Sequence, residues 1–265
     1  MGQILREHKG FGRQIFLLSK NELIKTYKAA LLGPLWAVIK PLFTLLVFWF
    51  AVQIGMRGSS QIAGYDRFLF MLTGFVPWFF MSDAITGGSK AIRTNSQFVT
   101  KITFPVSAIV TFTMLSRLYV HLMLCVLMYV YLLVAGVTPS VYNLQFFLYC
   151  PLMFLFFTCL AWSTAPMSSF SRDFENLISS TMTGLFWLSG IMWDSYSINI
   201  PWLKTLMIFN PVNFFANGYR KAFLYHQWLT DRPQETYIFL GELAVILLLG
   251  AWNYSRLRKR LPDIL

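Results

Sequence analysis

Five ionisable side chains stand inside long apolar stretches of this sequence: Lys40, Asp83, Arg117, His121 and Glu242. Such groups are costly to bury in apolar surroundings, so they normally face an opposite charge, water or a charged ligand. Arg117 and His121 are four residues apart and share one face of a helix. At the rise of an α-helix, Asp83 and Arg117 lie about 14 and 18 Å from the same end of two consecutive antiparallel helices. We therefore expect an Asp83–Arg117 ion pair, which would either fix helix packing or line a polar path.

Lys40 and Glu242, the other two charged groups, give weaker evidence for a functional site. Lys40 lies near the end of the first apolar stretch, where its long side chain can extend to a polar surface. Glu242 has no obvious partner. A proton relay would need a chain of carboxylates and histidines through the apolar layer. Since Asp83 and Glu242 lie on separate helices, an ion-coupled carrier is the weaker hypothesis.

The sequence contains none of the short motifs by which enzymes hold phosphate, metal or an activated nucleophile. It lacks the G-x-x-x-x-G-K-[ST] phosphate loop, H-E-x-x-H, C-x-x-C and G-x-S-x-G. His8, His121 and His226 are scattered along the chain and predict no metal site. We therefore expect no ATP hydrolysis and no cofactor in this chain. Any active transport would draw its energy from another chain or from an ion gradient.

The composition is typical of a membrane protein. Of the 265 residues, 56% are hydrophobic and 12% are charged, whereas a soluble domain carries about 25% charged residues. The net charge of +11 does not indicate nucleic-acid binding, because Lys and Arg flank the apolar stretches. Cys125, Cys150 and Cys159 fall inside apolar runs and predict buried thiols without disulfides. The sequence therefore predicts an all-α, polytopic integral membrane protein.

Six stretches are long enough to cross a bilayer as helices, which takes about 20 mostly apolar residues. A seventh, 198–218, contains Pro201 and Pro211 together with the polar Asn210, Asn213 and Asn217, so a continuous span there would leave backbone groups unpaired. We expect it to form short re-entrant or outer-surface helices before the last span. The six predicted spans are 33–56, 68–89, 104–135, 144–171, 176–193 and 236–255.

The distribution of Lys and Arg predicts the orientation. With six spans, both termini share one side with the loops at 90–103 and 171–175. This side carries 14 Lys and Arg residues, against 6 on the opposite side. The positive-inside rule makes the richer side cytoplasmic. A seventh span would place the basic run at 256–260 outside, so six spans are preferred.

The N-terminal segment does not resemble a secretory signal. Residues 1–32 contain six basic residues spread throughout and no apolar core. Residues 11–31 mix apolar and basic side chains and predict an amphipathic helix in the cytoplasmic interface, with a solvated basic tail as the alternative. We expect one transmembrane domain over 1–265, with an interface helix at 1–32, a six-span bundle at 33–255 and a cytoplasmic tail at 256–265.

Several short motifs occur in a defined order along the chain. Phe104-Pro105 begins the third predicted span, and Arg172-Asp173 precedes the fifth. The other motifs are Tyr27-Lys28, Leu32-Gly33-Pro34-Leu35-Trp36, Pro41-Leu42, Gly74-Phe75-Val76-Pro77-Trp78-Phe79-Phe80, Asn210-Pro211-Val212-Asn213-Phe214 and Gly218-Tyr219-Arg220. In this order they resemble the motifs of the permease subunits of polysaccharide ABC exporters, and the resemblance covers nearly the whole chain. The form after Asn210 is most similar to the wall teichoic acid branch, with O-antigen and capsule permeases as the alternative.

This resemblance implies a transport subunit, and no enzyme, in the bacterial cytoplasmic membrane. It implies a homodimer that works with a separate ATPase subunit, which binds ATP and Mg. The implied substrate is an anionic polysaccharide such as teichoic acid, linked to undecaprenyl diphosphate, and no nucleic acid is expected as a partner. A membrane-embedded transferase is a weaker alternative, because no cluster of acid, base or nucleophile stands at one membrane face. An ATP-independent flippase is a third possibility.

Four groups of residues are the expected sites. Substrate access is expected at Lys25, Tyr27, Lys28 and Trp36. Sugars stack on aromatic faces and cationic side chains attract an anionic polymer, so the channel candidates are Phe75, Trp78, Phe79, Asp83, Arg117, Tyr119, His121, Trp187 and Trp193. Contact with the ATPase is expected at Arg93, Phe98, Arg172, Asp173, Phe174 and Glu175. An outer gate is expected at Asn210, Pro211, Tyr219 and Arg220, with Arg220 paired to Asp194, Glu235 or an exiting phosphate.

Overall fold

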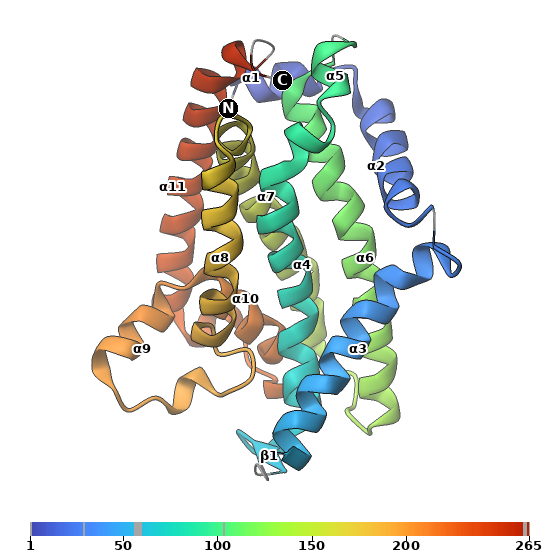
Figure 1. Cartoon of the computed structure of the whole chain (residues 1–265). Helices are drawn as coiled ribbons and strands as arrows, with labels where there is room; N and C mark the ends of the chain where they lie inside the picture. The colour runs from blue at the N-terminus through green and yellow to red at the C-terminus, as the bar shows by residue number, and fades with distance from the viewer. Residues whose placement is uncertain (1, 29, 56–59, 103, 262–263, 265) are drawn as a thin grey trace.

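Long helices run side by side between two ends of the molecule, and short helices cover both ends (Figure 1). The computed structural model describes residues 2–28, 30–55, 60–102, 104–261 and 264. Some predicted segments extend beyond these ranges. Residues 1 and 29 of the N-terminal segment, 56 of the first span, 103 of the loop before the third span, and 262, 263 and 265 of the tail lie outside the described residues.

Five helical stretches of the described chain are long and apolar enough to cross a membrane: 33–55, 67–100, 106–134, 141–170 and 233–260. They match the predicted spans one to four and six. The elements of the first half are α1 (Gly2–His8), α2 (Gly12–Tyr27), η1 (Gly33–Leu35), α3 (Trp36–Phe50), η2 (Ala51–Gly55), β1 (Gln61–Ile62), β2 (Tyr65–Asp66), α4 (Arg67–Thr94), α5 (Gln97–Thr100) and α6 (Val106–Val134).

The second half contains two long helices and several short ones at the end opposite the termini. Its elements are η3 (Val141–Gln145), α7 (Phe146–Phe170), α8 (Arg172–Leu188), η4 (Ser195–Ser197), α9 (Pro201–Ile208), α10 (Pro211–Arg220), η5 (Lys221–Tyr225), η6 (Leu229–Asp231), α11 (Pro233–Leu257) and η7 (Arg258–Arg260). Both termini lie at one end of the bundle, as the charge count predicted (Figure 1). Which side of a membrane this end faces stays a prediction.

The predicted fifth span, 176–193, differs from the structure. Its helix, α8, begins earlier, at Arg172, and ends at Leu188 after 17 residues. At 1.5 Å per residue this is about 26 Å, less than the ~30 Å of a hydrocarbon core. The helix stops because Gly190 adopts a φ of +45°, which only glycine takes at little cost. The count of six spans is therefore not confirmed by helix length and composition.

The ambiguous segment 198–218 is broken into two short helices, as its prolines and asparagines predicted. Asn210 separates α9 from α10, and its side chain accepts hydrogen bonds from the backbone N–H groups of Val212 and Asn213 at 3.0 and 3.3 Å. Pro211 occupies the first turn of α10, where its missing N–H costs nothing. Residues 212–220 of α10 are buried, so this helix inserts among the long helices.

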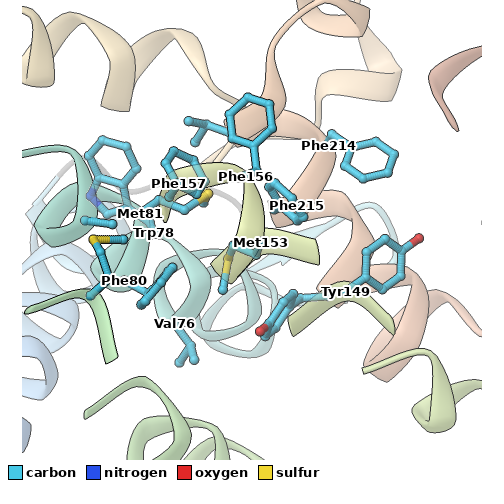
Figure 2. Close-up of a cluster of buried hydrophobic side chains, with 14 of the residues drawn as sticks. Val76, Trp78, Phe80, Met81, Tyr149, Met153, Phe156, Phe157, Phe214 and Phe215 are labelled. Atoms are coloured by element: carbon cyan, nitrogen blue, oxygen red, sulfur yellow. The ribbon is translucent and has the colours of Figure 1, made fainter. Parts of the chain in front are cut away.

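The core lies where α4, α7 and α10 meet (Figure 2). Van der Waals packing holds such an interior together when the surroundings are lipid, because lipid is as apolar as the side chains. Large side chains from all three helices interlock there, and Phe215 of α10 lies within 6.3 Å of both Phe156 and Phe157 of α7 between ring centroids. The labelled residues are Val76, Trp78, Phe80, Met81, Tyr149, Met153, Phe156, Phe157, Phe214 and Phe215.

The N-terminal helices pack against the long helices. Ile15 of α2 is buried against Ile109 and Phe112 of α6, and the Ser19 Oγ lies 2.9 Å from the Tyr119 Oη. The predicted amphipathic helix is thus present, but part of its apolar face meets α6 instead of lipid. α1 is held by Glu7, whose carboxylate accepts hydrogen bonds from Ser107, Tyr254 and Arg258.

Candidate functional site

The predicted ion pair between Asp83 of α4 and Arg117 of α6 is present. The Arg117 Nε lies 3.3 Å from the Asp83 Oδ2 and also donates to the Asp83 backbone oxygen at 3.1 Å. An Nη atom of Arg117 donates to the Thr113 backbone oxygen at 2.8 Å. The Arg117 side chain is 17% exposed, whereas that of Asp83 is 60% exposed. The pair therefore holds the guanidinium in place and leaves part of the carboxylate open.

Asp83 and Arg117 line a cleft of about 240 Å³ between α2, α3, α4 and α6, called here the polar cleft. Tyr27, at the end of α2, and Lys40, in α3, also line it, with the Lys40 Nζ 5.9 Å from the centre of the Tyr27 ring. Burial raises the pKa of Tyr27, and the Asp83 carboxylate raises it further, so its hydroxyl stays a neutral donor. Two cations, one carboxylate and one phenol therefore meet in one apolar-walled cleft, a combination suited to a phosphate or polyol group.

The structure separates the four predicted access residues. Tyr27 lines the polar cleft, but Lys25, Lys28 and Trp36 are not among its lining residues. Lys25 is exposed and lies 3.9 Å from Glu22. The lysine that lines the cleft is instead Lys40. From its position near the end of a span, Lys40 was predicted only to extend its side chain to a polar surface. The missed signal is the spacing of Ala37, Lys40 and Pro41, which places these three lining residues on one face of α3.

Several predicted channel residues lie in the core of the protomer. Phe75 and Trp78 are 1% and 7% exposed, with their rings 5.4 and 5.5 Å from that of Phe186. In this structure they pack α4 against α8 and do not face an open channel. Phe79 is the predicted aromatic of this motif that lines the polar cleft.

His121, a predicted channel residue, lines the polar cleft beside Arg117 but offers almost no exposed surface. It is 1% exposed, and its Nε2 lies 2.6 Å from the Tyr219 Oη. His121 and Tyr219 thus join α6 to α10. Tyr119 holds α2 through its contact with Ser19, as described above.

The remaining two channel candidates lie at the end of α8. Trp187 is 53% exposed. The Trp193 Nε1 donates to the Trp187 backbone oxygen at 3.0 Å. These two rings therefore remain accessible at the end opposite the termini.

The predicted ATPase-contact residues gather at the end that carries the termini. Glu175, in the first turn of α8, lies 3.0 Å from the Lys90 Nζ and 2.7 Å from an Arg93 Nη, both of α4. Arg93 also donates to the Ser168 backbone oxygen of α7. Three helices are thus tied together at this point, and a displacement of α8 here would be passed to α4.

An open pocket of about 310 Å³ lies beside this junction and is lined by Arg93, Ser96, Ser169, Phe170, Arg172 and Ile264. Arg172 and Asp173 are exposed and Phe174 is half-buried. Phe98, in α5, packs on Phe104 and Phe112 with ring centroids 5.6 Å apart in both cases. The predicted contact residues therefore form one end surface with a concave, basic centre.

At the opposite end, Arg220 of α10 is fully buried and is held by backbone oxygens. It donates to the carbonyls of Gly190 at 2.7 Å and Ile191 at 2.6 Å, and its guanidinium carbon lies 3.6 Å from the centre of the Phe70 ring. A Cβ at Gly74 would fall 2.5 Å from the Arg220 Nη2, so a residue larger than glycine does not fit at this position. Burial lowers the pKa of Arg220 to about 10, so it stays charged near neutral pH.

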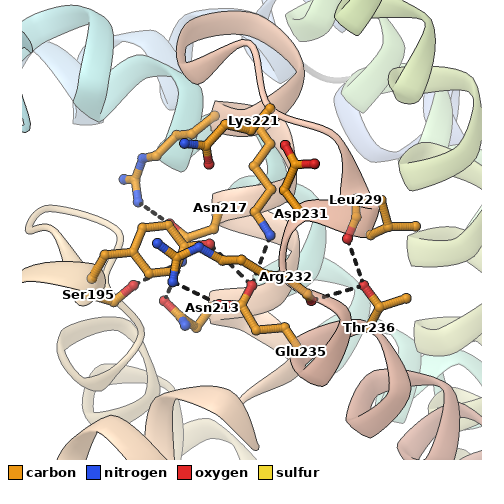
Figure 3. A network of polar contacts seen from close by, with 12 residues as sticks. Ser195, Asn213, Asn217, Lys221, Leu229, Asp231, Arg232, Glu235 and Thr236 are labelled. Atoms are coloured by element: carbon orange, nitrogen blue, oxygen red, sulfur yellow. Dashed lines mark hydrogen bonds and ion pairs between the residues drawn. The ribbon is translucent and has the colours of Figure 1, made fainter.

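The predicted pairing of Arg220 with Asp194 or Glu235 is wrong, because the next residue supplies the pair (Figure 3). The Lys221 Nζ lies 2.9 Å from the Glu235 Oε2. Lys221 is 2% exposed in its side chain, and burial lowers its pKa while Glu235 opposes that shift. Helix geometry turns adjacent residues about 100° apart, so Arg220 and Lys221 point to different partners. The pair ties the segment after α10 to the start of α11.

Within the described ranges, His, Cys, Asp and Glu side chains form no group of three that could hold a metal ion. The arrangement consists of a polar cleft inside the bundle, a basic surface at one end, and a buried arginine with an ion pair at the other. Such a layout can hold a polar ligand inside the bundle.

Curated relatives cover nearly the whole chain. The O-antigen export system permease protein RfbA of Myxococcus xanthus is 25% identical over 260 residues, which are 98% of this chain and 97% of that protein. The protein of the same name from Klebsiella pneumoniae is 26% identical over 256 residues, or 95% of this chain and 94% of that protein. These relatives favour the O-antigen alternative over the teichoic acid branch that the motif after Asn210 suggested.

One family model matches a segment that contains every predicted span except the last. This segment includes the polar cleft, Arg220, and the basic residues Arg93 and Arg172 of the surface at the end that carries the termini, called here the basic end surface. Residues 13–224 match the ABC-2 type transporter family. The match begins within α2 and ends within η5. The chain belongs to the ABC-2 type transporter family.

Proposed function

We propose that this chain is the membrane-spanning subunit of an ATP-driven exporter of a lipid-linked polysaccharide. The observation that carries the proposal is the full-length similarity to two permeases of O-antigen export systems. Several apolar helices of membrane-crossing length support a multi-pass protein of the cytoplasmic membrane. A polysaccharide of the O-antigen type is the favoured substrate, and the positive-inside rule places both termini in the cytoplasm.

A separate ATPase would bind ATP and Mg and dock on the basic end surface around Arg93, Arg172 and Glu175. The ion pairs of Glu175 with Lys90 and Arg93 tie α8 to α4, so a push on α8 would move both helices as rigid bodies. The lipid diphosphate of the substrate would approach the polar cleft, where Lys40 and Arg117 offer cations and Tyr27 a hydroxyl.

A second copy of the chain is expected to cover α8. One face of this helix presents exposed polar side chains at Asn176, Ser180 and Thr183, at the spacing of one helical stripe. Polar side chains in a membrane helix face protein or water more favourably than lipid. Two α8 helices around a shared axis would therefore line a path for hydroxyl-rich polymer, with Trp187 near its outer end.

Deletion of the gene tests the proposal directly. Cells without the chain should lose surface polysaccharide and accumulate the lipid-linked polymer on the inner face, and the tagged chain should co-purify with an ATPase. Normal surface polysaccharide in the deletion strain would refute the proposed export function. Turnover of a lipid-linked substrate by the purified chain alone would favour a transferase instead.

Replacement of Arg117 by alanine should lower export roughly tenfold, since loss of one charge-assisted contact of about 1.4 kcal/mol changes a rate or affinity tenfold. Asp83→Asn, which keeps an acceptor for Arg117, should have a smaller effect. Surface polysaccharide, normalised to the amount of folded chain in the membrane, is the measurement. Arg256→Ala, which removes an exposed arginine of α11, serves as the control. Wild-type export by Arg117→Ala would rule out a role for the polar cleft.

Replacement of Glu175 by glutamine should uncouple the ATPase from the bundle while the chain still folds. The change weakens two partly exposed ion pairs, each worth about 1 kcal/mol or less for stability, but it loosens the junction of α4 and α8. We expect a several-fold loss of polymer-stimulated ATP hydrolysis by the reconstituted complex. Glu22→Gln, at an ion pair within α2, should leave hydrolysis unchanged. Equal stimulation of both variants would contradict this coupling route.

A further inference from the structure

A second polar pocket lies at the end opposite the termini, away from the polar cleft. It measures about 240 Å³ and is lined by Ala63, Tyr65, Asp194, Tyr196, Tyr225 and Gln227. These residues come from three separate places in the chain: the β1–β2 hairpin, the turn after α8, and the end of η5 with the residues that follow. The hairpin lies at the lower end of the molecule (Figure 1). Among these residues only Asp194 was singled out from the sequence, as one of the expected partners of Arg220.

Three tyrosine rings form the pocket's apolar surface. The Tyr225 ring lies 5.5 Å from that of Tyr65 and 6.4 Å from that of Tyr196, between centroids. Tyr65 is positioned by the two-residue turn of the hairpin, where Ala63 and Gly64 both adopt positive φ, at 52° and 82°. Tyr196 is held from its other side by Arg232, whose guanidinium carbon lies 3.6 Å from the ring centre. The rings are therefore fixed before any ligand arrives, which lowers the entropy cost of binding.

The polar groups of the pocket have unused hydrogen-bonding capacity. The Tyr225 Oη is buried without a hydrogen-bond partner among the described residues. Burial raises the pKa of Tyr225 to about 12, so this hydroxyl stays protonated and able to donate. The Asp194 Oδ1 accepts from the Tyr196 N–H at 3.0 Å, while Oδ2 accepts no hydrogen bond from the described residues. Buried polar atoms without partners are rare in folded proteins and here point toward a ligand.

We infer that this pocket is a saccharide-binding subsite on the exit side of the exporter, which rests on the proposed function. A sugar ring presents apolar C–H faces that pack on tyrosine rings. Its hydroxyls can donate to Asp194 and both donate to and accept from the Gln227 amide and the Tyr225 hydroxyl. Drug-sized ligands occupy pockets of roughly 300–1,000 Å³, so the smaller volume of this pocket suits a single sugar residue.

A neighbouring pocket favours a segment of a polymer over an isolated sugar. This pocket measures about 350 Å³ and shares Tyr196, and its charged lining residues are Lys204, Arg232 and Glu235. Two pockets that share one aromatic lining residue can hold consecutive residues of a chain. These pockets would thus bind the polymer at the exit end of the bundle between cycles of ATP hydrolysis. Such binding would oppose return of the polymer into the bundle.

Saturation-transfer difference NMR on the full chain in nanodiscs tests this subsite. The probe is the lipid-free oligosaccharide released by mild acid from the envelope of the source cells. We expect transfer from the wild type, and a roughly three- to tenfold weaker dissociation constant for Tyr225→Phe, which removes only the unpartnered hydroxyl. Tyr237→Phe, the same change at an exposed position of α11, should bind like the wild type.

Two outcomes overturn the subsite: no transfer from the wild type, or equal affinity for Tyr225→Phe and Tyr237→Phe. Export assays in cells separate this failure from failure of the proposed function. If the wild type exports polysaccharide fully but shows no saturation transfer to the oligosaccharide, the proposed subsite is wrong and the proposed export function stands. If oligosaccharide binding depends on Tyr225 but deletion of the gene leaves surface polysaccharide unchanged, the subsite stands and the proposed export function is wrong.

Discussion

Replacement of Arg220 by methionine should prevent stable folding, with a loss of more than about 3 kcal/mol in the free energy of unfolding. The methionine side chain fills much of the same space but cannot donate to the carbonyls of Gly190 and Ile191, which lie at 2.7 and 2.6 Å from Arg220 in the wild type. Those oxygens would remain buried without their donors, and each such group costs about 1–3 kcal/mol.

The thermal unfolding midpoint of the purified chain in detergent measures this loss. Arg220→Lys should be intermediate, because a lysine keeps the charge but cannot reach several oxygens with one planar group. Arg13→Met, at an exposed position of α2, should unfold like the wild type. An Arg220→Met variant with an unchanged midpoint would show that α10 is held by its apolar packing alone.

Replacement of Gly250 by alanine should force α11 away from α7. An added Cβ at Gly250 would lie 2.5 Å from the backbone oxygen of Cys159, and a backbone atom cannot rotate aside. We expect a loss of about 1–3 kcal/mol or more from overpacking. Gly241→Ala, in the same helix with no atom within 4 Å of the new Cβ, should be neutral or gain about 0.5–1 kcal/mol.

These two glycines make a matched pair, because the substitution and the helix are the same and only the neighbour differs. Unfolding midpoints of both variants, measured in one detergent, report the difference. A Gly250→Ala variant as stable as Gly241→Ala would mean that α7 and α11 can separate freely, contrary to the close packing seen here.

The long helices were predictable because hydrophobicity and length act locally. The predicted span 68–89 lies within α4, and 104–135 matches α6 to within two residues at its start and one at its end. The break at Asn210-Pro211 was also predictable, since the cap and the proline act on the backbone of the next turn. The Asp83–Arg117 pair followed from helix rise alone, because consecutive antiparallel helices bring equal depths together.

The early end of α8 could not be predicted from its apolar composition. Gly190 ends the helix through a positive φ, and the turn that follows brings the carbonyls of Gly190 and Ile191 to Arg220. The need for that turn is visible only when α10 is in place. The misassigned partner of Glu235 has the same origin, since the choice between Arg220 and Lys221 depends on how α10 is rotated against α4 and α11.

The amino-acid sequence by itself determined which segments are long, apolar helices, that Asp83 and Arg117 meet, and that 198–218 cannot be a continuous span. Each of these follows from distances along one helix or between two neighbours. Only the tertiary structure decided that Phe75, Trp78 and His121 are buried, that Lys40 joins the polar cleft, and that three tyrosines meet in a pocket at the end opposite the termini. The physical reason is that the rotation of each helix about its axis is set by packing against several others at once, which no local pattern encodes.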